Sequence, residues 1–263
     1  MTRCIPWWLF LPALLAAGDG PVRPSKKIAL FNGRDLSGFY VSMKDTGRDD
    51  PRGVFAVQNG VIRISGEAWG GLTTEQEYAD YRLVVEWKWG EKTWPPRENN
   101  ARDSGILIHG TGADGAGGNG WLESIEYQII EGGTGDLILV AGAGRPQVTV
   151  EAEQRSNGQF YWKPGAPRVT RDRGRINWYG RDMAWQDRKG FRGVADLEKP
   201  VGQWNRSEII ARDGELTFRL NGRIVNQALD SNRRQGKIQI QSEGAEIFVR
   251  KIELHPLPRS AGK

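Results

Sequence analysis

The stretch GELTFRLNGRIVNQ, residues 214–227, places two alternating runs of apolar and polar residues on either side of Asn221-Gly222. Asn-Gly favours the positive φ values of a two-residue hairpin turn, and such alternation has the period of a half-buried strand. The stretch therefore predicts a β-hairpin. VFAVQNGVIRIS, residues 54–65, repeats the pattern around Asn59-Gly60, and Asp213-Gly214 marks a third turn.

The same alternation recurs along the rest of the chain. In YRLVVEWKW, residues 81–89, the leucine, the second valine and both tryptophans fall on one face of a strand. Six further runs predict strands: SGILIHG (104–110), IEYQIIE (125–131), DLILV (136–140), RSEIIA (206–211), KIQIQS (237–242) and EIFVRKIEL (246–254). We find no amphipathic pattern of ten or more residues. Around a dozen strands predict an all-β fold of two packed antiparallel sheets, a β-sandwich or jelly roll.

The first 18 residues predict a signal peptide, because an arginine precedes an apolar run from Ile5 to Ala17 that small residues follow. We therefore expect a secreted or periplasmic protein with a single β-sandwich domain over residues 19–263 and no membrane span after cleavage. An uncleaved N-terminal anchor is the alternative. Cys4 is the only cysteine, so the mature chain would have no disulfide and no thiolate chemistry.

The net charge of +5 arises in residues 141–200, which hold twelve basic and seven acidic residues. Strand signals are few there, so we expect a long basic loop insertion that crosses one edge of the sandwich or covers the mouth of a binding face. Bases alternate with acids between residues 171 and 193, as on a surface rich in ion pairs, so we predict no nucleic-acid partner. An anion or substrate patch is the alternative.

Cofactor motifs are weak. GAGGNG, residues 115–120, has the spacing of a dinucleotide-binding loop, but a predicted strand follows it where that motif needs a helix, so we predict no nucleotide cofactor. The only histidines are His109 and His255, and no zinc-binding or EF-hand motif occurs. No motif predicts a cofactor, and a divalent cation such as Ca²⁺, held by carboxylates and carbonyls, stays open.

Polar residues follow one face of two predicted strands. Glu126 and Gln128 alternate with apolar neighbours, and in KIQIQSEG, residues 237–244, Gln241 and Glu243 do the same. Two such stripes predict a polar concave surface on which carboxylates perform acid–base chemistry. A solvated outer sheet face is the alternative.

Seven stretches, in this order, carry a resemblance to a known family: ALFNGRDLSGF (29–39), FAVQNGVIRIS (55–65), GGLTTEQEYADYRLVVEWKWG (70–90), DSGILIHG (103–110), IEYQIIEGGTGDLILV (125–140), GQWNRSEIIARDGELTFRLNG (202–222) and GKIQIQSEGAEIFVRKIELHPL (236–257). Over residues 28–256 the chain resembles the 3-keto-disaccharide hydrolase domain family. The resemblance implies a concanavalin-like jelly roll and an exported bacterial protein that acts on sugars or glycosides.

The resemblance also suggests residues for the site. We expect Glu126, His109 and Glu243 to be catalytic, with Glu126 as the base or acid. We expect substrate contacts from a second set of residues: Gln128, Glu131, Gln241, Trp178, Tyr179 and Trp121. Glu131 stands where the family commonly has aspartate, and Glu243 where many members have histidine.

The implied reaction cleaves 3-keto-glycosides or 3-keto-disaccharides. The ketone at C3 acidifies the proton at C2, a base removes that proton, the enolate expels the glycosidic oxygen at C1, and water adds later. Two alternatives stay open: an ordinary glycosidase with a pair of carboxylates, and a non-catalytic, lectin-like carbohydrate-binding module. The sequence does not predict the oligomeric state.

Overall fold

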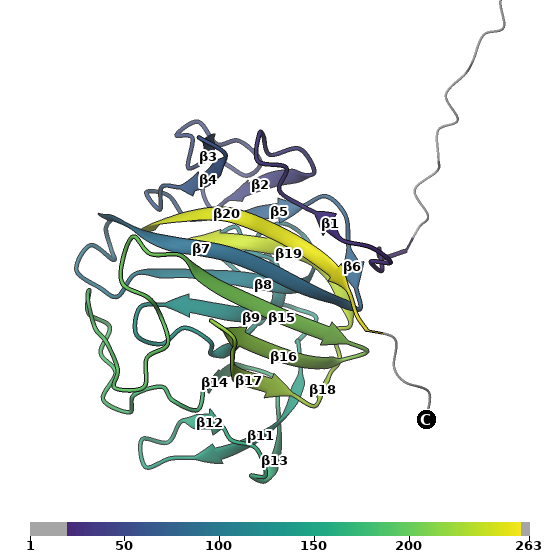
Figure 1. The fold of residues 1–263 in the computed structure, drawn as a ribbon, viewed down its shortest axis with the longest axis vertical. Coiled ribbons are helices and arrows are strands. Elements are labelled where there is room, and N and C mark those ends of the chain that lie inside the picture. Colours follow the sequence, from purple (N-terminus) through teal and green to yellow (C-terminus); the bar gives the residue numbers. More distant parts are fainter. Residues whose placement is uncertain (1–19, 259–263) are drawn as a thin grey trace, which may run out of the picture.

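The alternating runs form strands in the computed structural model, which describes residues 20–258 (Figure 1). Twenty strands and no helix occur in this range, and the strands form two sheets. The β-sandwich predicted from the sequence is therefore confirmed. The predicted signal peptide lies outside the described residues, and within them no helix is long and apolar enough to cross a membrane.

The first sheet has eight strands in the order β17-β16-β15-β7-β20-β4-β3, with β1 beside β20. Its strands are β1 (Ile28–Ala29), β3 (Phe55–Gln58), β4 (Val61–Ile64), β7 (Tyr81–Thr93), β15 (Asn205–Arg212), β16 (Glu215–Leu220), β17 (Arg223–Ala228) and β20 (Ala245–Pro256). All of its pairs are antiparallel.

The second sheet has twelve strands, in the order β13-β11-β12-β14-β10-β9-β8-β19-β5-β2, with β18 beside β11 and β6 beside β19. They are β2 (Phe39–Met43), β5 (Gly70–Thr74), β6 (Tyr78–Ala79), β8 (Asp103–Thr111), β9 (Glu123–Ile130), β10 (Leu137–Val140), β11 (Val148–Gln154), β12 (Phe160–Trp162), β13 (Arg168–Arg171), β14 (Gly174–Asn177), β18 (Asp230–Ser231) and β19 (Gln235–Ser242). One pair, β12 with β14, is parallel, where the sequence predicted antiparallel sheets throughout.

The three predicted turns join neighbouring strands of the first sheet. Asn59-Gly60 joins β3 to β4, Asp213-Gly214 joins β15 to β16, and Asn221-Gly222 joins β16 to β17. All six of these residues have positive φ, as a type I′ turn requires. The turn residues thus set the register of the hairpins, and with it the face on which each side chain lies.

Side chains from the inner faces of both sheets form one core. Trp87 and Trp89 come from β7, while Ile125 and Tyr127 come from β9 in the other sheet, and all four are at most 1 % exposed. The ring of Tyr127 lies 5.1 Å from that of Phe218 in β16, across the sandwich. Because successive residues of a strand alternate between faces, the even-numbered residues of β9 point away from this core.

Residues 141–200 are not one long loop, which corrects the expectation for this segment. They contain the four strands β11 to β14, which extend the second sheet at the lower end of Figure 1. In β11 the residues alternate between buried Val148, Val150 and Ala152 and partly exposed polar neighbours. β12, β13 and β14 have only three or four residues each, too few to show a period in the sequence, whereas the alternation of β11 is visible there and was overlooked. Only residues 178–204 form a long irregular stretch.

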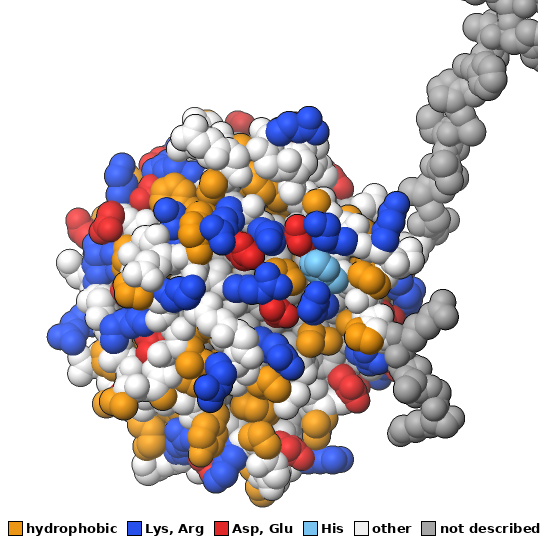
Figure 2. Space-filling view, in the orientation of Figure 1, with side chains coloured by type: hydrophobic (Ala, Val, Ile, Leu, Met, Phe, Trp, Pro, Cys, Tyr) orange, Lys and Arg blue, Asp and Glu red, His pale blue; other side chains and the backbone are white. Residues whose placement is uncertain are grey.

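The outward face of the first sheet carries charges of both signs. Glu86 of β7 accepts hydrogen bonds from Arg206 and Arg250, at 3.1 and 2.8 Å, and Lys251 lies 3.2 Å from it. Figure 2 shows basic and acidic side chains interleaved over β7, β15 and β20. Glu86 itself is buried, whereas the two arginines are partly exposed, so solvent screens these ion pairs.

Candidate active site

Glu126 lies in the middle of β9, on the face of the second sheet that points away from the core. We call this face, with Leu107, Glu126, Gln128 and Gln241, the polar face. Leu107 of β8 and Ile138 of β10 are its cross-strand neighbours, and its side chain is almost completely buried. The structure therefore agrees with the sequence on the direction in which Glu126 and Gln128 point.

Burial changes the acidity of Glu126. Desolvation, followed by the negative charges of Asp103 and Asp136, raises the pKa of Glu126 to about 8, although Arg175 acts in the opposite direction. No hydrogen bond from residues 20–258 contributes to this pKa. A carboxyl group that titrates near neutral pH and has unoccupied oxygens is equipped to exchange a proton with a bound molecule.

Asp103 and Glu243 lie close enough to Glu126 to affect its charge, and we call these three residues the carboxyl cluster. Burial raises the pKa of Asp103 to about 6, although the Arg97 guanidinium lies 3.1 Å away and lowers it. Burial, then the charges of Asp103 and Glu126, raise the pKa of Glu243 well above its usual value. Like charges at one site resist ionising together, so the cluster retains protons at neutral pH.

Gln128 links the carboxyl cluster to a cation. Its amide nitrogen donates to Asp103 at 2.5 Å and to the Ser104 carbonyl at 3.1 Å. Its amide oxygen accepts a hydrogen bond from Arg175 of β14 at 3.2 Å, and Arg175 also lies 3.3 Å from Asp136. Gln128 therefore holds Arg175 beside the cluster. The guanidinium of Arg175 is in a position to stabilise a negative oxygen on a bound molecule.

Gly105 separates Glu126 from Gln241. A Cβ atom at position 105 would overlap an oxygen of the Glu126 carboxyl and the amide oxygen of Gln241, so only glycine lets both side chains occupy this space. Gln241 is fully buried, and neither its amide nitrogen nor its amide oxygen has a hydrogen-bond partner in residues 20–258. A buried amide without partners is costly, and a bound polar molecule would satisfy it.

Apolar and aromatic residues border the carboxyl cluster on the same face. Leu107, Trp121 and Val140 form a small buried cluster, against which Trp69 and Ile138 pack. The rings of Trp69 and Trp121 stack 5.7 Å apart at 18°. Trp121 was predicted as a substrate contact, whereas no sequence pattern singled out Trp69, which is the more exposed of the two rings.

His109 lies apart from the polar face. The pairing of β8 with β9 shifts register between Ile108 and Thr111, and His109 has a φ of 53°. This irregularity turns its ring towards the first sheet, where it meets the edge of Tyr81 at 5.7 Å. Burial lowers the pKa of His109 to about 4. The structure does not bring His109 to Glu126, because a bulge breaks the alternation that its sequence position implies.

Glu131 takes part in a buried ion pair. It accepts from Arg102 at 2.7 Å, and its second oxygen accepts from the backbone N–H of Gly190 at 2.9 Å. Only 2 % of the residue is exposed. The bond to Gly190 ties the irregular stretch 178–204 to the end of β9. Both carboxylate oxygens of Glu131, a predicted substrate contact, therefore already accept hydrogen bonds from the protein.

Trp178 and Tyr179, two of the predicted substrate contacts, both line a cavity of about 580 Å³ away from the carboxyl cluster. Trp178 is buried in the main core, and its backbone N–H donates to Asp136 at 2.7 Å. Tyr179 is exposed, with the Arg155 guanidinium 5.2 Å from its ring. Neither residue contacts the carboxyl cluster through a hydrogen bond within residues 20–258, and the aromatic pair beside that cluster is Trp69 and Trp121.

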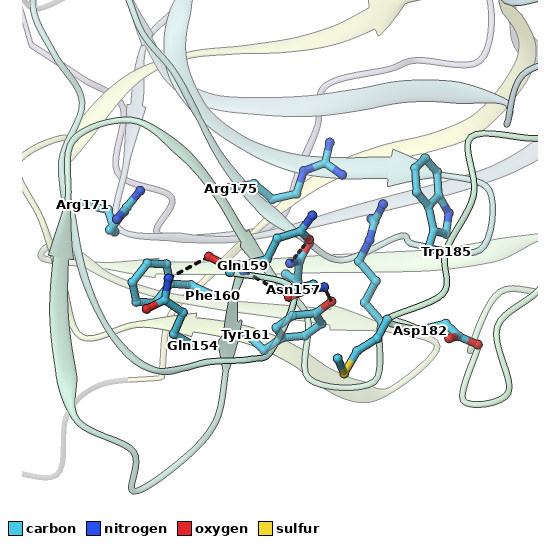
Figure 3. Close-up of a pocket in the computed structure, with 13 residues that line it drawn as sticks. Gln154, Asn157, Gln159, Phe160, Tyr161, Arg171, Arg175, Asp182 and Trp185 are labelled. Carbon is cyan, nitrogen blue, oxygen red and sulfur yellow. Dashed lines mark hydrogen bonds between the residues drawn. The ribbon is translucent and has the colours of Figure 1, made fainter.

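A cavity of about 560 Å³ opens beside the carboxyl cluster, and Arg175, which lines it, also donates to Gln128 next to that cluster (Figure 3). Its walls come from β11 to β14 and from the irregular stretch that follows them. They include the residues Gln154, Asn157, Gln159, Phe160, Tyr161, Arg171, Arg175, Asn177, Arg181 and Trp185. This volume suits a small molecule such as a sugar unit, and its lining mixes aromatic, amide and guanidinium groups.

Metal ligands are not grouped in the described chain. Across residues 20–258 no three or more His, Cys, Asp or Glu side chains are arranged to hold a metal ion. Asp103 is already engaged by Arg97 and Gln128. Binding of a divalent cation such as Ca²⁺, which the sequence left open, stays untested, and no step proposed below passes through a metal.

The polar face, its buried carboxyls and the aromatic border are features of carbohydrate sites on sandwich folds. The family described as the 3-keto-alpha-glucoside-1,2-lyase-like domain matches residues 26–255. The chain belongs to this family. The resemblance inferred from the sequence is confirmed, and the family places the chain among carbohydrate-active proteins.

Solved structures share the fold. A provisionally named glycosyl hydrolase from Parabacteroides distasonis has 18 % identity and a TM-score of 0.52, with 89 % of this chain and 94 % of that chain covered. The Bacillus licheniformis β-glucanase has 10 % identity and a TM-score of 0.46, with 89 % and 99 % covered. At these identities the similarity concerns the fold alone. Of the two structures, the Parabacteroides protein, with a TM-score above 0.5, supports that conclusion. No curated protein gave a significant match.

Proposed function

We propose that the chain cleaves 3-keto-glycosides by removing the proton at C2 and eliminating the oxygen at C1, with later addition of water. The observation that carries the proposal is the Glu126 carboxyl, which is buried, has a pKa of about 8 and is free of hydrogen bonds from residues 20–258. A ketone lowers the pKa of the neighbouring C–H group enough for a carboxylate base, whereas an ordinary glycoside offers no such proton.

The elimination has two electron movements. Ionised Glu126 takes the C2 proton, and the electrons of the C–H bond form an enolate with the C3 carbonyl. The enolate then collapses to a C1=C2 double bond while the C1–O bond breaks. The products are an unsaturated 3-keto sugar and an alcohol, and water added across the double bond at C1 gives the free 3-keto sugar.

Other residues of the polar face support these steps. Arg175 and the unpartnered amide of Gln241 are the donors that we assign to the enolate oxygen. Glu243, whose pKa burial raises well above its usual value, is the group to which we assign protonation of the departing oxygen. Trp69 and Trp121 provide an aromatic surface for a sugar ring. Gln128 positions Arg175 rather than touching the reacting atoms.

An ordinary glycosidase is the second candidate. Glu126 and Glu243 form a pair of protonatable carboxyls on one face, as a glycosidase requires. A lectin-like module is the third candidate, because a sugar-binding protein would use the aromatic pair. Such a protein has no use for a carboxyl group with a pKa of about 8, so this candidate ranks last.

The test is turnover by the purified chain on matched glycosides that differ only in the oxidation state of C3, with and without EDTA. We expect release of the alcohol from the 3-keto compounds alone, and a transient ultraviolet absorbance from the conjugated enone. Turnover of the ordinary glycosides would favour the carboxylate-pair mechanism. Binding without turnover of either would make the chain a sugar-binding module, and loss of activity in EDTA would add a metal.

A further inference from the structure

The cavity beside the carboxyl cluster has three arginines in its walls: Arg171, Arg175 and Arg181. Arg171 comes from β13 and Arg175 from β14, two strands that β11 and β12 separate in the sheet (Figure 3). Arg171 stacks on Phe160, with 4.7 Å between its guanidinium carbon and the ring centre. All three arginines belong to residues 141–200, whose surplus of basic residues equals the net charge of the protein. Part of that surplus therefore lies in the wall of a cavity.

Acidic side chains compensate these arginines only in part. Arg175 and Arg181 both pair with the same carboxylate, the fully buried Asp136. Within residues 20–258 no acidic partner lies within salt-bridge distance of Arg171. Asp182 is the remaining acid of the cavity wall, and one of its oxygens already accepts from the backbone N–H of Ala184 at 2.9 Å. The cavity therefore has an excess of positive charge.

The other groups of the cavity are suited to a sugar. Asn177 is 1 % exposed, and its side-chain oxygen has no hydrogen-bond partner among the described residues. Its nitrogen donates to Gln159 at 2.8 Å, which leaves the oxygen free to accept from a hydroxyl group. Phe160 and Trp185 add aromatic surface. An unpartnered buried acceptor beside uncompensated guanidinium groups indicates a ligand with both hydroxyl and anionic groups.

We propose that this cavity is a subsite for a sugar unit that bears an anionic group, a carboxylate or a sulfate, attached to the oxygen that leaves C1. The assignment to the leaving group rests on the proposed function, because Arg175 joins the cavity to the carboxyl cluster. A planar guanidinium binds a carboxylate or sulfate through two parallel hydrogen bonds, which gives both affinity and orientation.

Calorimetric titration of the full chain with methyl glucoside, methyl glucuronide and methyl glucoside 6-sulfate tests the subsite. We expect at least one anionic ligand to bind about tenfold tighter than methyl glucoside, with the difference shrinking as salt rises. The preferred anion identifies the source of the charge. Arg171→Gln should remove most of the preference. Arg168→Gln is the matched control, because Arg168 is an exposed residue of the same strand outside the cavity.

Equal binding of all three ligands by the wild-type chain would overturn the subsite. An equal loss of preference in Arg171→Gln and Arg168→Gln would also overturn it, since the effect would then belong to the general surface charge. These binding results do not depend on turnover. Absence of turnover on 3-keto-glycosides would refute the proposed function while leaving the titration as an independent answer about the cavity.

Discussion

Two buried glutamates, Glu126 and Glu198, have similarly raised pKa values and different surroundings. Glu126 and Glu198 are 4 % and 5 % exposed, and burial raises the pKa of each to about 8. Both oxygens of Glu198 are occupied, one by the indole N–H of Trp89 at 2.9 Å and the other by the backbone N–H of Gly132 at 2.8 Å. The carboxyl of Glu126 has no such donors within residues 20–258.

The two carboxyl groups differ in how much of their hydrogen-bonding capacity the protein already uses. Glu198 sits in the irregular stretch 178–204 and ties it to the core tryptophan and to the turn after β9. Glu126 stands beside Arg175 and the unpartnered amide of Gln241. A raised pKa alone thus does not mark a catalytic residue, because burial produces it at both places. Unused hydrogen-bonding capacity distinguishes the two.

Glu126→Gln should give the largest effect. Loss of the base lowers kcat on a 3-keto-glycoside by about a thousandfold, within the range of general acid–base catalysis. Circular dichroism should remain that of the wild-type chain, because glutamine has the shape of the protonated acid. Glu198→Gln is the matched variant and should keep its turnover. If Glu126→Gln retained wild-type kcat, Glu126 would be a second structural carboxyl.

Gly105→Ala should rank next. The added Cβ would displace the side chains of Glu126 and Gln241, and a displacement of about 1 Å costs roughly a hundredfold in rate. Gly71→Ala serves as control, since its Cβ would meet Gln239, which holds the glycine-rich loop through the backbone N–H of Leu122. Both changes crowd the same sheet, so equal losses of kcat in the two variants would contradict the specific role of position 105.

The pH dependence of kcat/KM should also distinguish Glu126 from Glu198, with a smaller effect than the two substitutions above. A base with a pKa of about 8 is mostly protonated at neutral pH, so kcat/KM should rise about tenfold per pH unit up to about pH 8 and then level off. Glu198→Gln should leave this profile in place. A profile that is flat between pH 5 and pH 8 would show that Glu126 does not act as the base.

Stability should respond most to Glu198. In Glu198→Gln the new amide group has two donors, so one would face the N–H of Trp89 or Gly132 and cost about 1–3 kcal/mol of unfolding free energy. The urea midpoint measures this loss. Glu126→Gln should leave the midpoint at pH 5 near the wild-type value, since Glu126 has no hydrogen bond to lose within residues 20–258.

The pH dependence of stability, unlike the stability at pH 5, should change when Glu126 is replaced. A carboxyl whose pKa is raised in the folded state stabilises the fold below its unfolded pKa, and this contribution is lost as pH rises through about 8. Glu126→Gln should therefore flatten the decline of the urea midpoint between pH 5 and pH 9. A decline as steep as that of the wild-type chain would mean that Glu126 titrates alike in both states.

Local patterns in the sequence were enough for most of the fold. Three Asn-Gly or Asp-Gly turns and the alternation in β7, β9 and β19 depend on neighbouring residues, so they are visible in one chain. The alternation of β11 is visible in the sequence and was overlooked. The strands β12 to β14 were missed because they have only three or four residues each, and their burial depends on partners such as β17 and β10. Tertiary context decides such strands, whose intrinsic preference is weak.

The site was predictable only in part, for a related reason. The direction of Glu126 and Gln128 follows from a strand period of two residues. Asp103 and Arg175 reach them only through the register of β8 with β9 and of β10 with β14. His109 is turned away by a bulge, and Glu131 is taken by Arg102, which no spacing rule reveals. Pairing between distant strands is the missing information.

The alternation along β9 has a consequence for how such a protein can evolve. Ile125, Tyr127 and Ile129 build the core, while Glu126 and Gln128 between them face the site. Selection for a new substrate acts on one set of side chains, and selection for folding acts on the other, although the two are interleaved in the same eight residues. A lineage can therefore exchange its chemistry while the scaffold that carries it is inherited unchanged.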